Sequence, residues 1–303
     1  MNIAYLISAH TDAPQLKRLV EALHPDAHFF IHIDKKSDIT PFQKALEGKS
    51  NVHFITPRID VRWGTILEVE YQMALIKAAV NHPFKFDRIF FLSGMDYPLW
   101  SNERITEWLE GLGDQEVLSG ICMDTPYIRG GQRDGYTLAR PFFKIPLLGN
   151  KGNQWLSILC RKVKGALGLR KPLSFVVEGD RWHLYKGAAW WCISEQLASY
   201  IYNMYTMEPA IRRYFVNSFG PAETLIQTIV FNSPQWASRC QLFQGEYPGL
   251  AALTPLHYIV YDPVIKVMDE TDYDTLIASG KMFTRKLVSG KSDQLVERLY
   301  GRK

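Results

Sequence analysis

Cysteine is scarce in this sequence, and the few cysteines that occur stand far apart. The 303 residues include four cysteines and no Cys-x-x-Cys pair. The pattern argues against a disulfide framework and against a zinc site. We expect reduced, buried thiols at the four positions, which are Cys122, Cys160, Cys192 and Cys240.

Long apolar runs are also missing. No run of 18 apolar residues occurs, so no segment is expected to cross a membrane. Residues 1–8 have no basic lead, and their apolar run is too short for a signal peptide. The net charge of +4 is too small to indicate nucleic-acid binding by itself. These features predict a soluble, cytoplasmic protein.

The glycine-rich motifs of common nucleotide-binding folds do not occur. A dinucleotide fold would place G-x-G-x-x-G after the first strand, yet the turn at residues 8–12 contains no glycine. This argues against an oxidoreductase that uses NAD or FAD. The chain also lacks G-x-x-x-x-G-K-[ST], which excludes phosphate binding by a P-loop.

What the chain does contain is an alternation of short apolar segments with helical periodicity. This alternation predicts an α/β layer structure with a mostly parallel sheet. Strands are predicted at residues 2–9, 28–34, 51–55, 87–92 and 256–261, and helices at about 16–23, 66–80 and 268–279.

Three polar residues follow the predicted strands directly. His10, Asp34 and Asp96 lie in the turns at 8–12, 34–37 and 93–98. Ligands bind beyond the carboxyl ends of parallel strands, so the three side chains could converge on one crevice. Each of them could instead be an ordinary loop cap.

Glu223 stands near the start of a predicted helix. Pro221 suits the first turn of a helix, and apolar residues then follow helical spacing at positions 225, 226, 229 and 230. The helix's unpaired N–H groups would hold a carboxylate there and keep it ionised, which suits a general base. The alternative is that Glu223 is one more acid in a first helical turn.

Residues 184–193 read as a strand entered through small residues. Gly187 and the alanines after it would let a ligand approach the backbone. Trp190 and Trp191 would face opposite sides, one in the core and the other free to stack on a sugar, so the pair is the candidate for acceptor binding. The sequence does not distinguish the two.

Two charged pairs bear on a diphosphate ligand. Asp272 and Asp274 form the only D-x-D in the chain, but acids are favoured at the helix start predicted there, so we interpret them as structural. Arg285 and Lys286 are adjacent cations, one a bidentate fork and one a point charge, and such a pair suits a diphosphate.

A long basic segment lies between residues 135 and 177. It contains eight Lys or Arg and no Asp or Glu. Residues 151–171 could form a basic amphipathic helix that contacts an anionic membrane surface. The alternative is a surface helix packed on its own domain with a solvated basic face.

Several of these stretches together resemble the core-2/I-branching N-acetylglucosaminyltransferase and peptide O-xylosyltransferase family. They occur in the family's order and span about residues 3–287. The stretches at 221–223 and 232–234 look closest to the xylosyltransferase branch. The matching stretches are 31–37, 63–64, 92–98, 186–191, 221–223, 232–234 and 283–286.

The resemblance implies a single GT-A glycosyltransferase domain over residues 1–303. Its nucleotide-sugar-binding half would be 1–120, and its acceptor and catalytic half 121–303. The expected reaction is an inverting, metal-independent transfer from a UDP-sugar, GlcNAc or xylose, to a hydroxyl of a glycan or lipid-linked glycan. No cofactor is expected. The chain lacks the N-terminal membrane anchor of the eukaryotic Golgi enzymes, which fits a bacterial-type, cytoplasmic version that could lie peripherally at the inner face of the membrane.

The same resemblance assigns roles to individual residues. It implies that Glu223 is the catalytic base and that Arg285 and Lys286 stabilise the leaving diphosphate. Asp34 and Asp96, with His10 beside them, would lie in the donor site. His257 occupies a position where many relatives have an arginine that reaches the diphosphate.

Two other classes of function stay open. One is a non-catalytic protein that binds a glycan or nucleotide on the same scaffold. The other is a metal-dependent transferase that uses Asp272 and Asp274.

Overall fold

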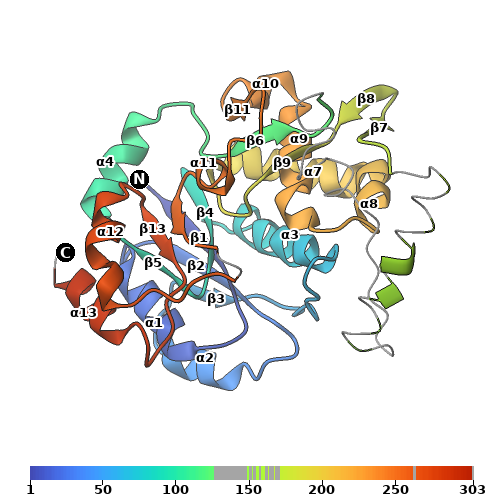
Figure 1. The fold of residues 1–303 in the computed structure, drawn as a ribbon. Coiled ribbons are helices and arrows are strands. Elements are labelled where there is room, and N and C mark those ends of the chain that lie inside the picture. Colours follow the sequence, from blue (N-terminus) through green and yellow to red (C-terminus); the bar gives the residue numbers. More distant parts are fainter. Residues whose placement is uncertain are drawn as a thin grey trace.

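The computed structural model describes residues 1–125, 171–261 and 264–301, together with scattered positions between 149 and 167 (Figure 1). Its central sheet has five strands in the order β10-β4-β1-β2-β3, and only β10 runs antiparallel to its neighbour. The strands are β1 (Ile3–Ala9), β2 (His28–Ile33), β3 (Val52–Phe54), β4 (Arg88–Ser93) and β10 (Cys192–Ile193). The prediction of an α/β fold with a mostly parallel sheet is confirmed.

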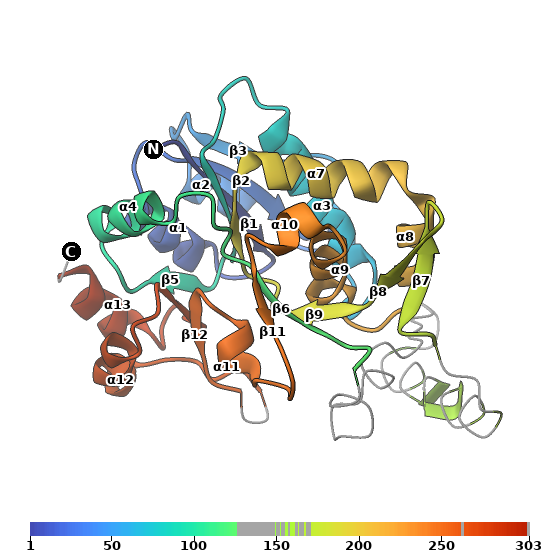
Figure 2. The same cartoon turned by 90° about the horizontal axis from the view of Figure 1, so that it is seen from above.

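Both faces of this sheet are buried, and alternate residues of each strand serve opposite faces. On β1, Ala4 and Leu6 join one apolar cluster, whereas Tyr5 and Ile7 join another. The first cluster lies under α3 (Leu67–Val80) and α7 (Glu195–Met207), which Figure 2 shows side by side.

The second cluster lies under three helices from the first part of the chain. These are α1 (Ala13–Ala22), α2 (Thr40–Ala45) and α4 (Asn102–Gly111). Asp12 begins α1 by accepting a hydrogen bond from the amide of Gln15, as its sequence position indicates.

Three smaller sheets complete the described part of the chain. β6 (Ser119–Cys122) lies between β9 (Tyr185–Gly187) and β11 (Gln241–Phe243). β13 (Phe283–Arg285) lies between β5 (Asp96–Pro98) and β12 (His257–Ile259), and β7 (Ser174–Val177) pairs with β8 (Asp180–His183). The remaining helices are α8 (Pro209–Phe215), α9 (Leu225–Phe231), α10 (Pro234–Ala237), α11 (Leu250–Leu253), α12 (Tyr273–Ala278) and α13 (Asp293–Tyr300), with the 3₁₀ helices η2 (Pro221–Glu223) and η3 (Glu270–Asp272).

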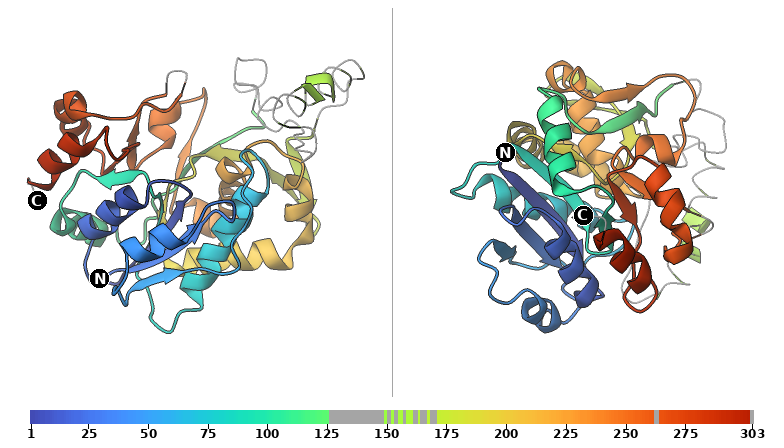
Figure 3. Two further views of the ribbon diagram at one scale, coloured as in Figure 1. Left: turned by 90° about the horizontal axis from the view of Figure 1, so that it is seen from below. Right: turned by 90° about the vertical axis from the view of Figure 1, so that its left-hand side faces the viewer.

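The C-terminal segment returns to the N-terminal one, and Figure 3 shows the red and blue segments against each other. Arg18 of α1 pairs with Asp293 of α13 at 2.6 Å, and Asp12 accepts hydrogen bonds from Ser289. Strand β10 of the central sheet comes from the second predicted half of the chain, and the predicted boundary at residue 120 falls inside β6. The two predicted halves therefore contribute strands to the same sheet.

The predicted strand at 184–193 is in fact two strands in different sheets. β9 pairs with β6, and β10 pairs with β4, with residues 188–191 between them. Gly187 serves packing rather than ligand approach, because a Cβ there would lie 2.1 Å from the Ser119 carbonyl oxygen. The small residue is required by the neighbouring strand.

The cysteines, the membrane-span prediction and the segment at 151–171 can also be compared with the structure. All four cysteines are free thiols, but Cys192 alone is fully buried and the others are partly exposed. Among the described residues, no helix combines the length and apolar character needed to cross a membrane. The predicted amphipathic helix at 151–171 lies mostly outside the described residues.

Candidate functional site

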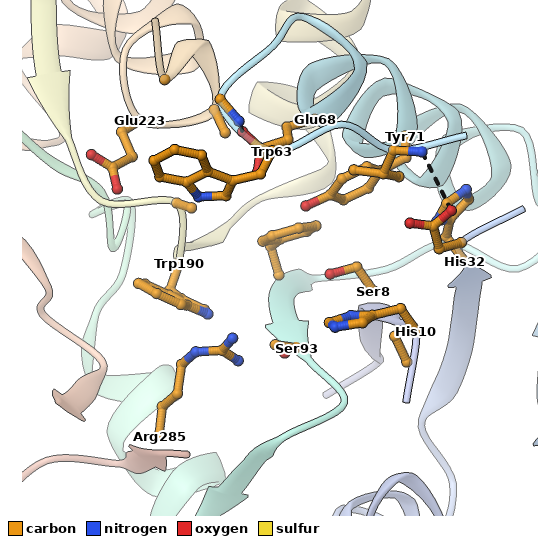
Figure 4. Close-up of a pocket in the computed structure, with 18 of the residues that line it drawn as sticks. Ser8, His10, His32, Trp63, Glu68, Tyr71, Ser93, Trp190, Glu223 and Arg285 are labelled. Atoms are coloured by element: carbon orange, nitrogen blue, oxygen red, sulfur yellow. Dashed lines mark hydrogen bonds between the residues drawn. The ribbon is translucent and has the colours of Figure 1, made fainter. Parts of the chain in front are cut away.

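A pocket of about 470 Å³ opens beyond the carboxyl ends of β1, β2 and β4 (Figure 4). Parallel strands all end at this edge, so the loops after them meet there. The lining residues are Ser8, Ala9, His10, His32, Asp34, Val61, Trp63, Gly64, Glu68, Tyr71, Phe91, Ser93, Ala189, Trp190, Phe219, Gly220, Ala222, Glu223, Ile265 and Arg285.

His10 and Asp34 line this pocket as their positions after β1 and β2 indicate. Asp34 Oδ1 accepts a hydrogen bond from the Lys36 amide at 3.0 Å, and Oδ2 pairs with the Lys36 ammonium at 3.0 Å. Burial lowers the pKa of His10, and the negative charge of Asp34 only partly offsets this. His10 is therefore a neutral imidazole at neutral pH.

Asp96 lies behind the pocket wall rather than on it, and its side chain is fully buried. One oxygen, Oδ2, accepts hydrogen bonds from the Ser93 amide at 2.7 Å and from His257 Nε2 at 3.0 Å. The other, Oδ1, accepts from Arg285 at 3.0 Å. Burial by itself would raise the pKa of Asp96, but His257 and Arg285 outweigh burial and lower it. Asp96 is thus an ionised anchor for two basic side chains.

His257 is equally buried and is absent from the pocket lining. Its Nε2 faces Asp96, and its ring lies 5.2 Å from that of Trp190. The structure therefore places His257 in contact with Asp96 and Trp190, one layer away from the pocket.

Arg285 and Lys286 separate at the end of β13. Arg285 reaches the pocket, where its guanidinium lies 5.4 Å from the ring centre of Trp190 (Figure 4). Lys286 follows the last residue of β13 and is not in the lining. Its positive charge nevertheless contributes to the lowered pKa of His10, so it lies near that end of the pocket.

The two adjacent tryptophans take different places, which the sequence could not distinguish. Trp191 is 1% exposed and stacks on Phe91 in the core. Trp190 lines the pocket between Glu223 and Arg285. Of the pair predicted for acceptor binding, only Trp190 reaches the pocket.

Glu223 is the last residue of η2, and the expected α-helix, α9, begins two residues later, after Thr224. The turn opens at Gly220, whose φ of 60° favours glycine. The Glu223 side chain is 44% exposed and lines the pocket. One carboxylate oxygen pairs with the ammonium of Lys186, a side chain that is only 8% exposed. The pair fixes a carboxylate at the pocket edge.

Several lining residues carry no sequence signal of their own. Trp63 and Glu68 come from the loop before α3 and from its first turn, and Glu68 accepts a hydrogen bond from the Gly64 amide at 2.7 Å. Tyr71 follows one helical turn later, and burial raises its pKa to about 12. Burial lowers the pKa of His32 to about 4, and its Nε2 accepts the Ile59 amide at 3.0 Å. The resemblance at 31–37 and 63–64 covers His32 and Trp63, but nothing in the sequence pointed to Glu68 or Tyr71.

The D-x-D pair lies elsewhere. Asp272 closes a capping box with Asp269 and pairs with Lys266, while the Asp274 side chain is 91% exposed beside Arg298. Neither lines the pocket. Their interpretation as helix-start residues is confirmed by this geometry.

The fold and the pocket define a mixed α/β protein with a candidate ligand site beyond its parallel strands. The chain belongs to the Core-2/I-Branching enzyme family, whose model matches residues 3–244. This confirms the resemblance noted in the sequence.

Curated relatives and solved structures give further similarities. Xylosyltransferase 2 from Mus musculus is 27% identical over 248 residues, which cover 78% of this chain and 25% of that protein. Xylosyltransferase 2 from Homo sapiens is 27% identical over 242 residues, with 77% and 25% covered. The chain thus spans about a quarter of the length of these relatives. The solved 4-diphosphocytidyl-2C-methyl-D-erythritol synthase from Anaerococcus prevotii aligns with a TM-score of 0.37 and 13% identity, over 81% of this chain and 88% of that one.

Proposed function

We propose that this protein is a glycosyltransferase of GT-A type that moves a sugar from a UDP-sugar to a hydroxyl of a glycan acceptor. The observation that carries the proposal is that one pocket holds both a carboxylate, Glu223, and a guanidinium, Arg285, with Trp190 between them. Family membership supports the reaction class. The xylosyltransferase relatives favour xylose as the sugar, and GlcNAc is the second candidate.

In the proposed reaction, Glu223 is the general base. An acceptor hydroxyl attacks the anomeric carbon while Glu223 takes its proton, which contributes roughly 10²–10⁴-fold to the rate. The bond from that carbon to the diphosphate oxygen breaks, and its electron pair leaves with UDP. A single displacement of this kind inverts the anomeric carbon. The nearby Lys186 ammonium holds the carboxylate in position.

The leaving diphosphate is proposed to meet Arg285. A cation fixed before the reaction stabilises developing charge without reorganising. Arg285 is fixed by its hydrogen bond to the buried Asp96, and other N–H groups of its guanidinium can face the ligand. Lys286 adds positive charge from nearby.

His10 and Asp34 are proposed to bind the nucleotide end of the donor, at the carboxyl ends of β1 and β2. Trp190 is proposed to stack on a sugar ring, because an indole face suits the apolar face of a sugar. In this arrangement Asp96 and His257 act through Arg285 and Trp190 rather than by touching the donor.

Metal independence makes a direct prediction. Transfer should survive EDTA, and a variant with Asp272→Asn and Asp274→Asn should keep nearly all of its turnover, because both carboxylates lie outside the pocket lining. Turnover is measured with chelator and then with added Mn²⁺ or Mg²⁺. An absolute requirement for either ion would favour the metal-dependent alternative.

The reaction itself is tested by screening donors and then looking for product. UDP, UDP-xylose and UDP-GlcNAc are compared by thermal shift, since a ligand at 100 times its Kd adds roughly 2.7 kcal/mol to stability. Mass spectrometry of donor plus glycan acceptors then decides between enzyme and binding protein. Donor binding with no glycosidic product from any acceptor would favour the non-catalytic alternative. A cytoplasmic location and membrane contact through 151–171 stay predictions.

A further inference from the structure

Three histidines meet at the edge of the central sheet, outside the pocket. His28 begins β2, His53 lies in β3, and His82 follows the end of α3. Each is partly buried, and each offers a ring nitrogen within 4.8 Å of those of the other two. We call this group the three-histidine cluster.

The fold brings these residues together through strand register. His53 pairs with Phe30 across the parallel β2–β3 ladder, and His28 stands two residues before Phe30, on the same face. α3 packs on that face, so the turn after it carries His82 to the same place. Neither His53 nor His82 is near His28 in sequence.

We propose that the three-histidine cluster binds one divalent transition metal ion, with zinc as the expected ion. Three imidazoles form a ligand set that suits zinc, copper and nickel, and they leave a fourth position for water. The cysteine pattern excludes a zinc site built on cysteines, whereas these three ligands are histidines distant from one another in sequence.

The spacing of the nitrogens supports this proposal. His28 Nδ1 lies 3.1 Å from His53 Nε2. In a tetrahedral site with Zn–N bonds of roughly 2.0–2.1 Å, neighbouring ligand nitrogens lie about 3.4 Å apart. These two nitrogens form a hydrogen bond, and a metal ion would take the place of its proton.

His82 must change its hydrogen bonding to complete the site. Its Nδ1 now accepts the Phe84 amide at 3.2 Å. A ligating nitrogen offers its lone pair while the other ring nitrogen carries the proton, so binding requires this ring to release the amide. His82 lies in a partly exposed turn beyond the helix end, where a side chain is less constrained than in the core.

Aromatic rings surround the cluster. Phe84 and Phe86 lie against the ring of His28, with centroids 5.1 and 5.5 Å away, and Phe30 lies against the ring of His53, with a centroid 5.0 Å away. These contacts hold two of the three ligand rings beside each other.

The site would be separate from the pocket and from the proposed transfer. Tyr71 lines the pocket from the first half of α3, and His82 lies eleven residues further on, roughly 16 Å along a helix axis. An ion there would link β2, β3 and the turn after α3. Its loss should lower thermal stability without stopping the proposed transfer, so the two proposals can fail separately.

The test is zinc binding by the full chain, purified without a histidine tag and freed of metal with chelator. Calorimetric titration with zinc chloride should give one ion per chain, and the melting temperature should rise with zinc. His82→Asn should weaken zinc binding by about tenfold or more, because it removes one of three ligands. His183→Asn is the matched control, since His183 ends β8, in a different sheet from the cluster, and pairs with Asp124.

Two results would overturn the proposal: no zinc binding by the wild type, or equal affinity in the wild type and His82→Asn. Should His82→Asn fail to fold, the wild type still decides by NMR. Zinc should then shift the ring signals of three of the eight histidines, those of His28, His53 and His82. Shifts confined to other histidines would also contradict the site.

Discussion

Glu223→Gln is expected to lower turnover by at least about 100-fold while donor binding persists. Glutamine keeps the shape of the side chain and can still contact Lys186, but it cannot take a proton from an acceptor hydroxyl. The loss should appear in kcat, because the proton transfers during the chemical step rather than in the ground state. Steady-state rates and a calorimetric UDP titration measure the two effects separately.

Glu110→Gln is the matched control, because it removes one exposed carboxylate from α4, outside the pocket lining. Its turnover and UDP affinity should equal those of the wild type. Wild-type turnover in Glu223→Gln would remove Glu223 from the role of base. Loss of UDP affinity in step with turnover would instead indicate that the substitution damages the donor site.

The sequence predicted the central layer well because its signals there are local. Runs such as 3–7 and 89–92 are apolar throughout, as strands buried on both faces must be. The start of α1 is local too, because Asp12 accepts a hydrogen bond from the Gln15 amide only three residues away. His10 and Asp34 were located because the residue after a parallel strand has only one edge of the sheet to occupy.

The site was predicted less completely because orientation and burial depend on distant partners. The turn position of Asp96 gave its neighbourhood, but its burial follows from His257 and Arg285, which lie 161 and 189 residues away. The strand predicted at 184–193 is two strands because its first part pairs with β6 and its last part pairs with β4. Lys186, the partner of Glu223, lies 37 residues before it, and no sequence motif connects these two positions.

Of the two adjacent cations, only Arg285 lines the pocket, so the second large effect is expected from its substitution. Arg285→Ala is expected to weaken UDP binding by about 10–100-fold and to lower turnover as well, because a charge-assisted contact contributes roughly 1.5–3 kcal/mol. The effect on turnover follows from negative charge that develops on the diphosphate as the sugar bond stretches. Lys286→Ala should act in the same direction but less strongly, since Lys286 is not in the pocket lining.

Arg285→Ala also removes a partner from the fully buried Asp96, so stability must be separated from binding. Removing one partner of a buried ion pair lowers the free energy of unfolding by up to about 3–5 kcal/mol. Arg285→Lys keeps a positive charge near Asp96 but loses the planar fork, and it should retain more stability than Arg285→Ala while still binding UDP more weakly than the wild type. The melting temperatures of the variants are measured first, and the titrations are run well below the midpoint of the least stable one.

The deciding variants are Arg285→Lys, Lys286→Ala and a double variant that carries both Arg285→Ala and Lys286→Ala. If UDP binds all three as it binds the wild type, neither cation contacts the diphosphate. A metal-free transfer in this pocket would then have no positive group to stabilise its leaving group, and the proposed mechanism would not stand.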